Sequence, residues 1–101
     1  MDYSKMSDFE INWKVAFHIG LRTVEKAESG DFNPCNNVSD AWPIIVSNKI
    51  SLYAFKEEAA DRRGAWGAEG CEITSPFHFN DNPLRAAMTV FLMMQDARNE
   101  K

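Results

Sequence analysis

Residues 82–95 read NPLRAAMTVFLMMQ, a segment that predicts a helix with two apolar faces. Asn82 suits the cap of this helix and Pro83 its first position, where the backbone amide has no intrahelical acceptor. We expect the helix to end near Arg98. Such a helix has to be covered by the sheet on one side, and by another helix or a second copy of the protein on the other. Its two stripes are Leu84, Ala87, Met88, Phe91, Leu92 and Ala86, Val90, Met93, Ala97.

The first half of the chain predicts two further helices. Ser7 to Glu10 (SDFE) has the pattern of a capping box, so a helix should run from Asp8 to Ile19 and end at Gly20. Ser39 or Asp40 should cap the next helix, with Pro43 in its first turn and its end near Asn48. Between these two helices, residues 22–26 (RTVEK) are expected to form a short edge strand.

The second half predicts strands before the last helix. Residues 50–55 alternate in the manner of a strand with one aromatic face, and residues 71–77 predict another strand, in which Pro76 implies an edge position or the strand's end. Residues 57–70 mix charges with glycines, so we expect a mobile loop with a short strand at 65–68. The predicted fold class is α/β, a small α/β sandwich. Two or three helices should pack on a short, mainly antiparallel sheet, within a single domain spanning residues 1–101.

Composition limits the classes of partner. The chain is 45% hydrophobic and 26% charged, which is ordinary for a globular protein, and its net charge of −4 repels phosphate backbones. Generic nucleic-acid binding is therefore disfavoured, whereas docking on a basic protein surface is compatible. The apolar runs are too short for a signal peptide or a membrane span, so we expect a cytosolic protein with free thiols at Cys35 and Cys71.

Sequence patterns for catalysis, metals and cofactors are lacking. The chain has no nucleophile elbow, zinc-protease pattern, glycine-rich phosphate loop or zinc-ligand spacing. We expect a non-enzymatic protein without a cofactor, in which His18 and His78 are structural or surface residues. A dyad of Cys35 with His78 stays open, because catalytic partners meet in space and not along the chain.

The amide-rich loop at residues 33–37 (NPCNN), here called the Asn loop, is the best candidate for a binding site. Its amides can donate and accept hydrogen bonds, Asp40 suits a hydroxyl or a basic group, and Trp42 offers a flat apolar wall. Turn chemistry, helix capping and core packing of Trp42 explain the same residues without a ligand. The candidate ligand-binding residues are Asn33, Asn36, Asn37, Asp40, Trp42 and Arg85.

Arg85 has two interpretations of its own. Near the N-terminus of the last helix it could hold a phosphate or carboxylate, together with the amides of the Asn loop. Alternatively, it forms a salt bridge to Asp40, Asp81 or a glutamate of the 57–70 loop. Arg62 and Arg63 beside Trp66 are a further, weak signal for stacking on a nucleobase.

Three segments carry a resemblance to a known family. MDYSKMSDFEIN, FNPCNN…DAWPII and NPLRAAMTVFLMMQ resemble the NinX-like family of small lambdoid-phage proteins, and more distantly the phage ABA sandwich domains. The resemblance implies the order helix, loop, helix, hairpin, Arg-Ala helix, and a phage accessory protein of the host cytoplasm.

The family implies no particular activity, so two functions stay open. One is counter-defence by sequestering a host nucleotide-derived molecule, and the other is an acidic module that inhibits a host or phage enzyme. With either function, the apolar last helix predicts a homo-oligomer.

Overall fold

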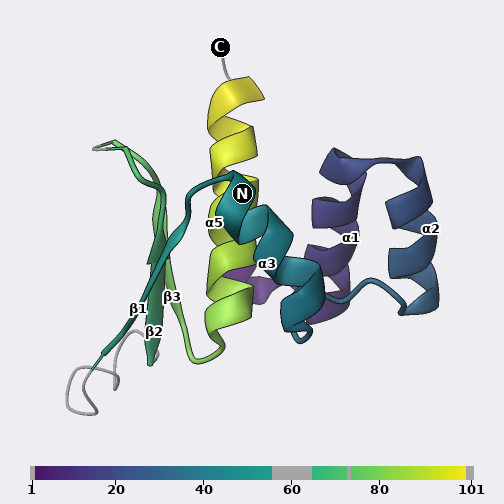
Figure 1. Ribbon diagram of the computed structural model, residues 1–101, viewed down its shortest axis with the longest axis horizontal. Helices are drawn as coiled ribbons and strands as arrows, with labels where there is room; N and C mark the ends of the chain where they lie inside the picture. The colour runs from purple at the N-terminus through teal and green to yellow at the C-terminus, as the bar shows by residue number, and fades with distance from the viewer. Residues whose placement is uncertain (1, 56–64, 73, 100–101) are drawn as a thin grey trace.

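The computed structural model describes residues 2–55, 65–72 and 74–99. These residues form an α/β fold in which helices pack on a three-stranded antiparallel sheet, as predicted (Figure 1). The described residues contain four α-helices, one more than the two or three expected. The elements are η1 (Tyr3–Lys5), α1 (Asp8–Ile19), α2 (Leu21–Ser29), α3 (Val38–Ser47), β1 (Ser51–Ala54), β2 (Trp66–Glu69), β3 (Phe77–Asn80) and α5 (Pro83–Asn99).

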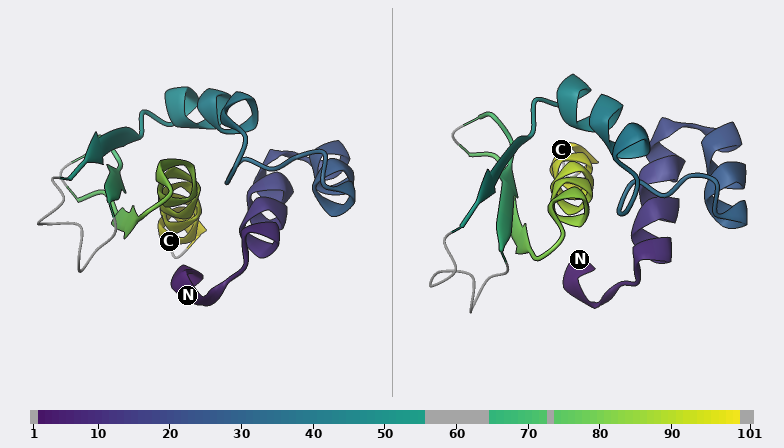
Figure 2. Two further views of the ribbon diagram at one scale, coloured as in Figure 1. Left: turned by 90° about the horizontal axis from the view of Figure 1, so that it is seen from below. Right: turned by 60° about the horizontal axis from the view of Figure 1, so that its bottom comes forward.

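Helix α5 lies at the centre of the molecule. Figure 2 (left) shows it surrounded by the sheet, α3, α1 and the N-terminal segment. Every residue from Ala86 to Leu92 is buried, including Thr89, whose hydroxyl donates to the Arg85 carbonyl oxygen at 2.9 Å. The apolar character of this helix on nearly all sides is therefore matched by cover on all sides.

The same chain covers the second apolar stripe of α5. Val90 is buried, Met93 is partly buried against the core and Ala97 is exposed. The sheet lies on one side of α5, and α1 and α3 lie on the other (Figure 1). Of the two covers expected for this helix, another helix of the same chain is the one observed, so α5 gives no reason to invoke a second copy.

The sheet has the order β1-β2-β3, and both pairings are antiparallel. Leu52, Ala68 and His78 stand side by side in the register, and Ala68 is fully buried. On the alternate positions, Tyr53 pairs with Gly67, where an added Cβ would lie 2.4 Å from Cε2 of the tyrosine ring. The glycine thus lets this ring lie across the strand. The Tyr53 and Phe55 rings meet edge to face, confirming the predicted aromatic face of this strand.

The first helix has the predicted bounds, and its capping box is present. The Ser7 hydroxyl accepts from the Glu10 amide at 3.1 Å, and the Glu10 carboxylate accepts from the Ser7 amide at 3.2 Å. Helix α3 begins earlier than predicted, because Asn37 and not Ser39 or Asp40 is its cap. Pro43 consequently lies inside the helix, where it has no amide to offer the carbonyl of Ser39.

The expected edge strand at residues 22–26 is wrong, because this segment belongs to α2. Val24 and Ala27 are buried at helical spacing, while the charged residues between them are exposed. Gly30 ends the helix with left-handed geometry (φ 89°), which a side chain at this position would disfavour. The helical spacing of the buried residues decides the structure here and outweighs the preference of the β-branched residues at positions 23 and 24 for a strand.

The third strand begins later than predicted. Residues 71–76, apart from position 73, form bends and a turn, and the strand is Phe77–Asn80. The amide of Ser75 donates to the Glu72 carbonyl oxygen, and the Gly70 amide donates to that of Pro76, so the backbone here closes a turn. The short strand predicted at 65–68 is observed as β2. Residues 57–64 of the predicted loop, including Arg62 and Arg63, lie outside the described residues.

We predict that Leu92→Ala lowers the free energy of unfolding by about 2–5 kcal/mol, because it opens a cavity beside α5. Leu92 is 1% exposed, whereas Leu21 is 77% exposed, so Leu21→Ala is a matched control that should cost less than about 0.5 kcal/mol. Urea denaturation followed by circular dichroism measures both. Equal losses for the two variants would contradict the central position of α5.

Candidate functional site

The Asn loop is held against α1 by a buried amide that sequence analysis did not single out. Asn12, on α1, donates from Nδ2 to Asn33 Oδ1 at 2.7 Å and accepts from the Cys35 amide at 3.0 Å. The Asn33 carbonyl oxygen also accepts from the amides of Asn36 and Asn37. Asn12 could have been noticed as a polar residue on the buried Ile11–Val15 face. These bonds consume much of the hydrogen-bonding capacity expected to face a ligand.

Arg85 is committed to an internal ion pair. Its Nη1 donates to Asp8 Oδ1 at 2.6 Å, and its Nη2 donates to the carbonyl oxygens of Tyr3 and Met6 at 3.0 and 2.6 Å. The Arg85 side chain is 12% exposed and that of Asp8 is 41% exposed. The salt-bridge interpretation of Arg85 is thus the one observed, although the partner is Asp8 and not Asp40, Asp81 or a loop glutamate.

Asn36 and Asn82 join the loop to this ion pair. Asn36 Nδ2 donates to Asp8 Oδ2 at 3.0 Å, and Asn82 Nδ2 donates to the Cys35 carbonyl oxygen at 2.6 Å. The loop and the start of α5, far apart in sequence, therefore meet as predicted. They meet in a network whose polar groups bind one another and the N-terminal segment.

The electrostatics of Asp8 reflect these contacts. Burial is the largest single influence on its carboxyl group and raises the pKa, but hydrogen bonds from Arg85 and Asn36 and the charge of Arg85 together bring the pKa below its ordinary value. The ionised carboxylate is thus the form that the network stabilises.

The other predicted site residues lie in different places. Asn37 caps α3 by accepting from the Ser39 amide, and Asp40 Oδ2 accepts from the Asn33 amide at 2.9 Å. Trp42 is exposed on the outer side of α3 and does not pack in the core. Of the predicted residues, Asp40 is the one that also lines a groove on the surface.

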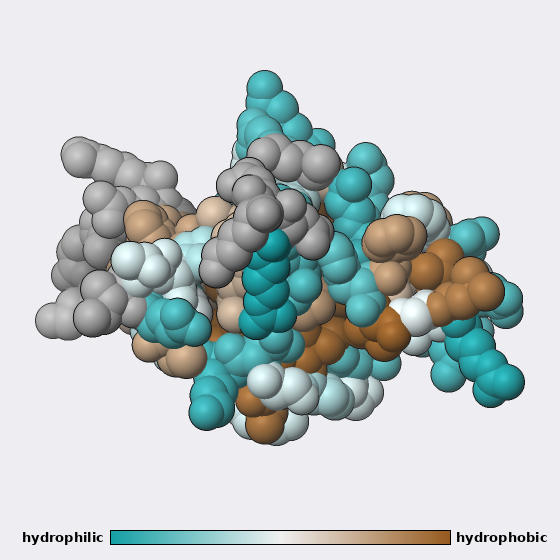
Figure 3. All heavy atoms as spheres, turned by 90° about the horizontal axis from the view of Figure 1, so that it is seen from above, coloured by the Kyte–Doolittle hydropathy of each residue, from teal (hydrophilic) through white to brown (hydrophobic). Residues whose placement is uncertain are grey.

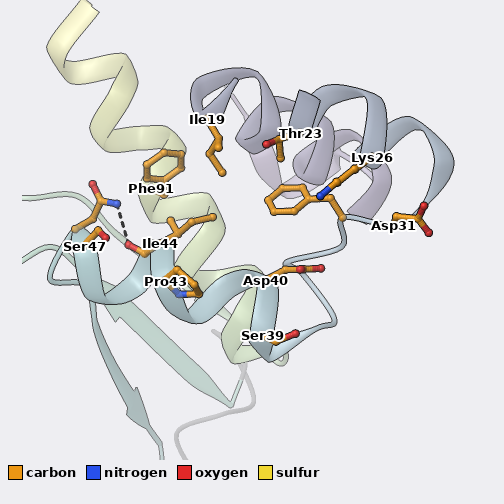
Figure 4. A pocket seen from close by; sticks show the side chains of 12 residues that line it. Ile19, Thr23, Lys26, Asp31, Ser39, Asp40, Pro43, Ile44, Ser47 and Phe91 are labelled. Carbon is orange, nitrogen blue, oxygen red and sulfur yellow. Dashed lines mark hydrogen bonds between the residues drawn. The ribbon is translucent and has the colours of Figure 1, made fainter. Parts of the chain in front are cut away.

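That groove lies between the α1–α2 hairpin and α3 and has a volume of about 480 Å³. Figure 4 shows Ile19, Thr23 and Lys26 on one wall, Ser39, Asp40 and Pro43 on the other, and Phe91 of α5 at one end. Figure 3 shows hydrophobic side chains gathered where the hairpin and α3 approach each other. The full lining is Ile19, Thr23, Lys26, Asp31, Phe32, Ser39, Asp40, Pro43, Ile44, Ser47, Asn48 and Phe91.

The groove exists because α2 packs mainly on α1 and stands away from α3. The loop after Gly30 then carries Phe32 back toward the core, and its buried ring fills the base of the gap. The groove is a product of this hairpin geometry, which the expected strand at residues 22–26 would not have made.

The buried Cys35 thiol does not have the electrostatics of a nucleophile. Both cysteines are free, as predicted; Cys35 is buried and Cys71 is exposed. Burial raises the pKa of the Cys35 thiol to about 12, so this thiol is protonated at neutral pH, whereas a cysteine nucleophile needs a lowered pKa. The described residues contain no cluster of three or more His, Cys, Asp or Glu that could hold a metal ion.

The comparison with protein families agrees with the sequence resemblance. The family model described as "Bacteriophage P22, NinX" matches residues 2–95. The chain belongs to the NinX family. No curated protein and no solved structure matches this NinX chain. Among the described residues, no helix has the length and apolar character needed to cross a membrane.

We predict that Asp8 makes the stability of this NinX chain depend on acid pH. A carboxyl whose folded pKa is lowered contributes stability above its unfolded pKa, near 3.8, and loses it as pH falls through the folded value. Wild type should therefore be more stable to unfolding than Asp8→Asn by about 1–2 kcal/mol at pH 6, a figure reduced for the partial exposure of Asp8. The difference should shrink as pH falls below 3.8 and vanish once pH lies below the folded pKa.

The control is the same substitution in an Arg85→Met background, where the charged donor is gone and the hydrogen bond from Asn36 remains. There Asp8→Asn should change the pH profile of unfolding much less. A pH dependence that persists unchanged in that background would show that Arg85 is not the partner that matters.

Proposed function

We propose that the protein is a non-catalytic phage accessory protein that sequesters a small host molecule of the nucleoside class in the groove between the α1–α2 hairpin and α3. The observation that carries the proposal is the groove itself, in which the Phe32 and Phe91 side chains and the Asp40 carboxylate line one space. Its volume of about 480 Å³ falls in the range of small-ligand sites. Family membership places the protein in a phage, and counter-defence in the host cytoplasm is the role we propose for such sequestration.

The lining supplies the contacts that such a ligand needs. Two aromatic side chains, with Ile19 and Ile44 beside them, offer an apolar surface to the flat base of a nucleoside. Asp40 and Ser39 can bind ribose hydroxyls through their side-chain oxygens.

Charge narrows the ligand to forms with little or no phosphate. Asp31 and Asp40 outnumber Lys26 in the lining, and the guanidinium of Arg85 is occupied by Asp8 and two carbonyls. A polyphosphate would meet net repulsion here. The nucleotide-derived ligand expected from sequence therefore becomes a nucleoside or a similar hydroxyl-bearing aromatic compound.

We predict that Thr23→Trp removes ligand binding, because the indole would fill the groove from the α2 wall. Glu25→Trp makes the same change at an exposed position of α2 outside the lining and should bind as wild type does. Immobilised proteins are incubated with small-molecule extracts of phage-infected cells, and released compounds are identified by mass spectrometry.

Enrichment of one ultraviolet-absorbing compound by wild type and Glu25→Trp, but not by Thr23→Trp, is the expected result. If no compound is enriched, or if Thr23→Trp retains it, the groove is not a small-molecule site.

The acidic protein-interaction module is favoured by a separate observation. Val38, Trp42 and Val46 are all exposed and follow one another at four-residue spacing on α3, which makes an apolar row suited to a protein surface. We predict that a protein partner, if this is the function, co-purifies with wild type and Thr23→Trp and is lost with Trp42→Ser. Retention of that partner by Trp42→Ser would exclude the row as its contact.

A further inference from the structure

Helix α1 exposes a row of three aromatic side chains. Phe9, Trp13 and Phe17 follow one another at four-residue spacing and are 53%, 37% and 63% exposed, while Ile11 and Val15 on the opposite face are fully buried. The rings of Trp13 and Phe17 stack with centroids 5.9 Å apart. Aromatic groups are enriched at interfaces, and a contiguous row of them on one helix face is unusual for a surface that meets only water.

A hollow of about 300 Å³ lies beside this row. Trp13, Phe17 and Lys14 line it from α1, and Tyr3, Leu92 and Asp96 close it from the N-terminal segment and α5. Tyr3 donates to the Asp96 carboxylate, which fixes the far wall. A hollow of this size next to an aromatic row can receive a ring from a partner, as anchor pockets at interfaces do.

The row is symmetric about Trp13, with a phenylalanine on each side of it. Phe9 stands four residues before Trp13, and Phe17 stands four residues after it. If two copies of α1 packed antiparallel about a twofold axis at Trp13, each Phe9 would face a Phe17, and the two indoles would face each other. Phe9 of the second copy would then lie next to the hollow, which Phe17 borders.

The charges beside the row favour the same arrangement. Glu10 and Lys14 lie on one flank of the row, each one residue after an aromatic. In the antiparallel pair, Lys14 of one copy would come within about 3 Å, measured along the helix axis, of the level of Glu10 of the second copy. In a parallel pair the flank that carries Glu10 and Lys14 would face the opposite flank of the second copy, so this contact would not form. The described residues contain a single ion pair, Arg85 with Asp8, so Lys14 is free of an ion pair within the part described.

We propose that the protein forms a twofold homodimer through antiparallel packing of α1, with Phe9 of each copy against Phe17 of the other. This interface uses none of the residues that line the groove proposed as the ligand site. It also differs from the self-association expected from α5, whose apolar stripes are mostly buried within one chain.

The test is sedimentation velocity of the full chain over a range of concentrations, with a charge-swap series. Phe9→Lys and Phe17→Glu, each alone, should raise the dissociation constant by about tenfold or more, since each introduces two buried charges facing aromatic rings. The double variant Phe9→Lys/Phe17→Glu should recover dimer, because the introduced ammonium of one copy then faces the introduced carboxylate of the other. Phe9 and Phe17 are both exposed, so neither substitution should disturb the core, and circular dichroism checks that the fold is kept.

The matched control is Val38→Lys/Val46→Glu, which makes the same kind of changes on the exposed row of α3 and should leave the dimer intact. A wild type that is monomeric at all concentrations, or single α1 variants that remain dimeric, would overturn the proposal. A double variant that stays as monomeric as the single ones would overturn the antiparallel register on which the proposal rests.

Discussion

The enclosure of α5 is the constraint on which the other elements depend. A helix whose residues from Ala86 to Leu92 are all buried needs apolar neighbours around its whole circumference. A three-stranded sheet can cover only one side, so α1 and α3 have to form a second layer, and the N-terminal segment completes the ring (Figure 2). Thr89 is compatible with this position because its hydroxyl bonds back to the helix at Arg85.

Polar residues that resembled a binding site turn out to join these layers. The Asn loop must pass from α2 to α3 across the starts of α1 and α5, where backbone and helix-terminal groups need partners. Asn33, Asn36, Asn82 and the ion pair of Asp8 with Arg85 satisfy such groups. Within the described residues, no buried side-chain nitrogen or oxygen lacks a hydrogen-bond partner. The loop chemistry is thus explained by internal bonding, which directs attention to the groove beside it.

Local signals in the sequence predicted the elements that local physics determines. The capping box predicted the start of α1 and Gly20 predicted its end. Asn82 with Pro83 predicted the start of α5, and the alternation of residue types predicted β1. The helix at residues 21–29 was missed because its two buried positions acquire meaning only against α1. The start of β3 was displaced because the turn at Ser75 and Pro76 depends on pairing with β2.

The site was harder to predict than the fold, for the same reason. Arg85 binds groups that are 77 to 82 residues away in sequence, so no spacing pattern could identify its partners. The groove lining likewise comes from α1, α2, the loop that follows α2, α3 and α5, and only Asp40 among the expected residues lies in it. The phage family was expected from the resemblance of three sequence segments, and the family comparison confirms it.

The placement of α5 also bears on how the chain is made. The helix that fills the centre follows α1, α3 and the sheet in sequence, so during translation these elements emerge before the surface on which they pack. Tyr3 and Asp96, which bond across 93 residues, cannot meet until Asp96 has left the ribosome. The nascent protein therefore has to keep its apolar segments apart until α5 has emerged, and the contacts that then form are long-range ones that slow folding.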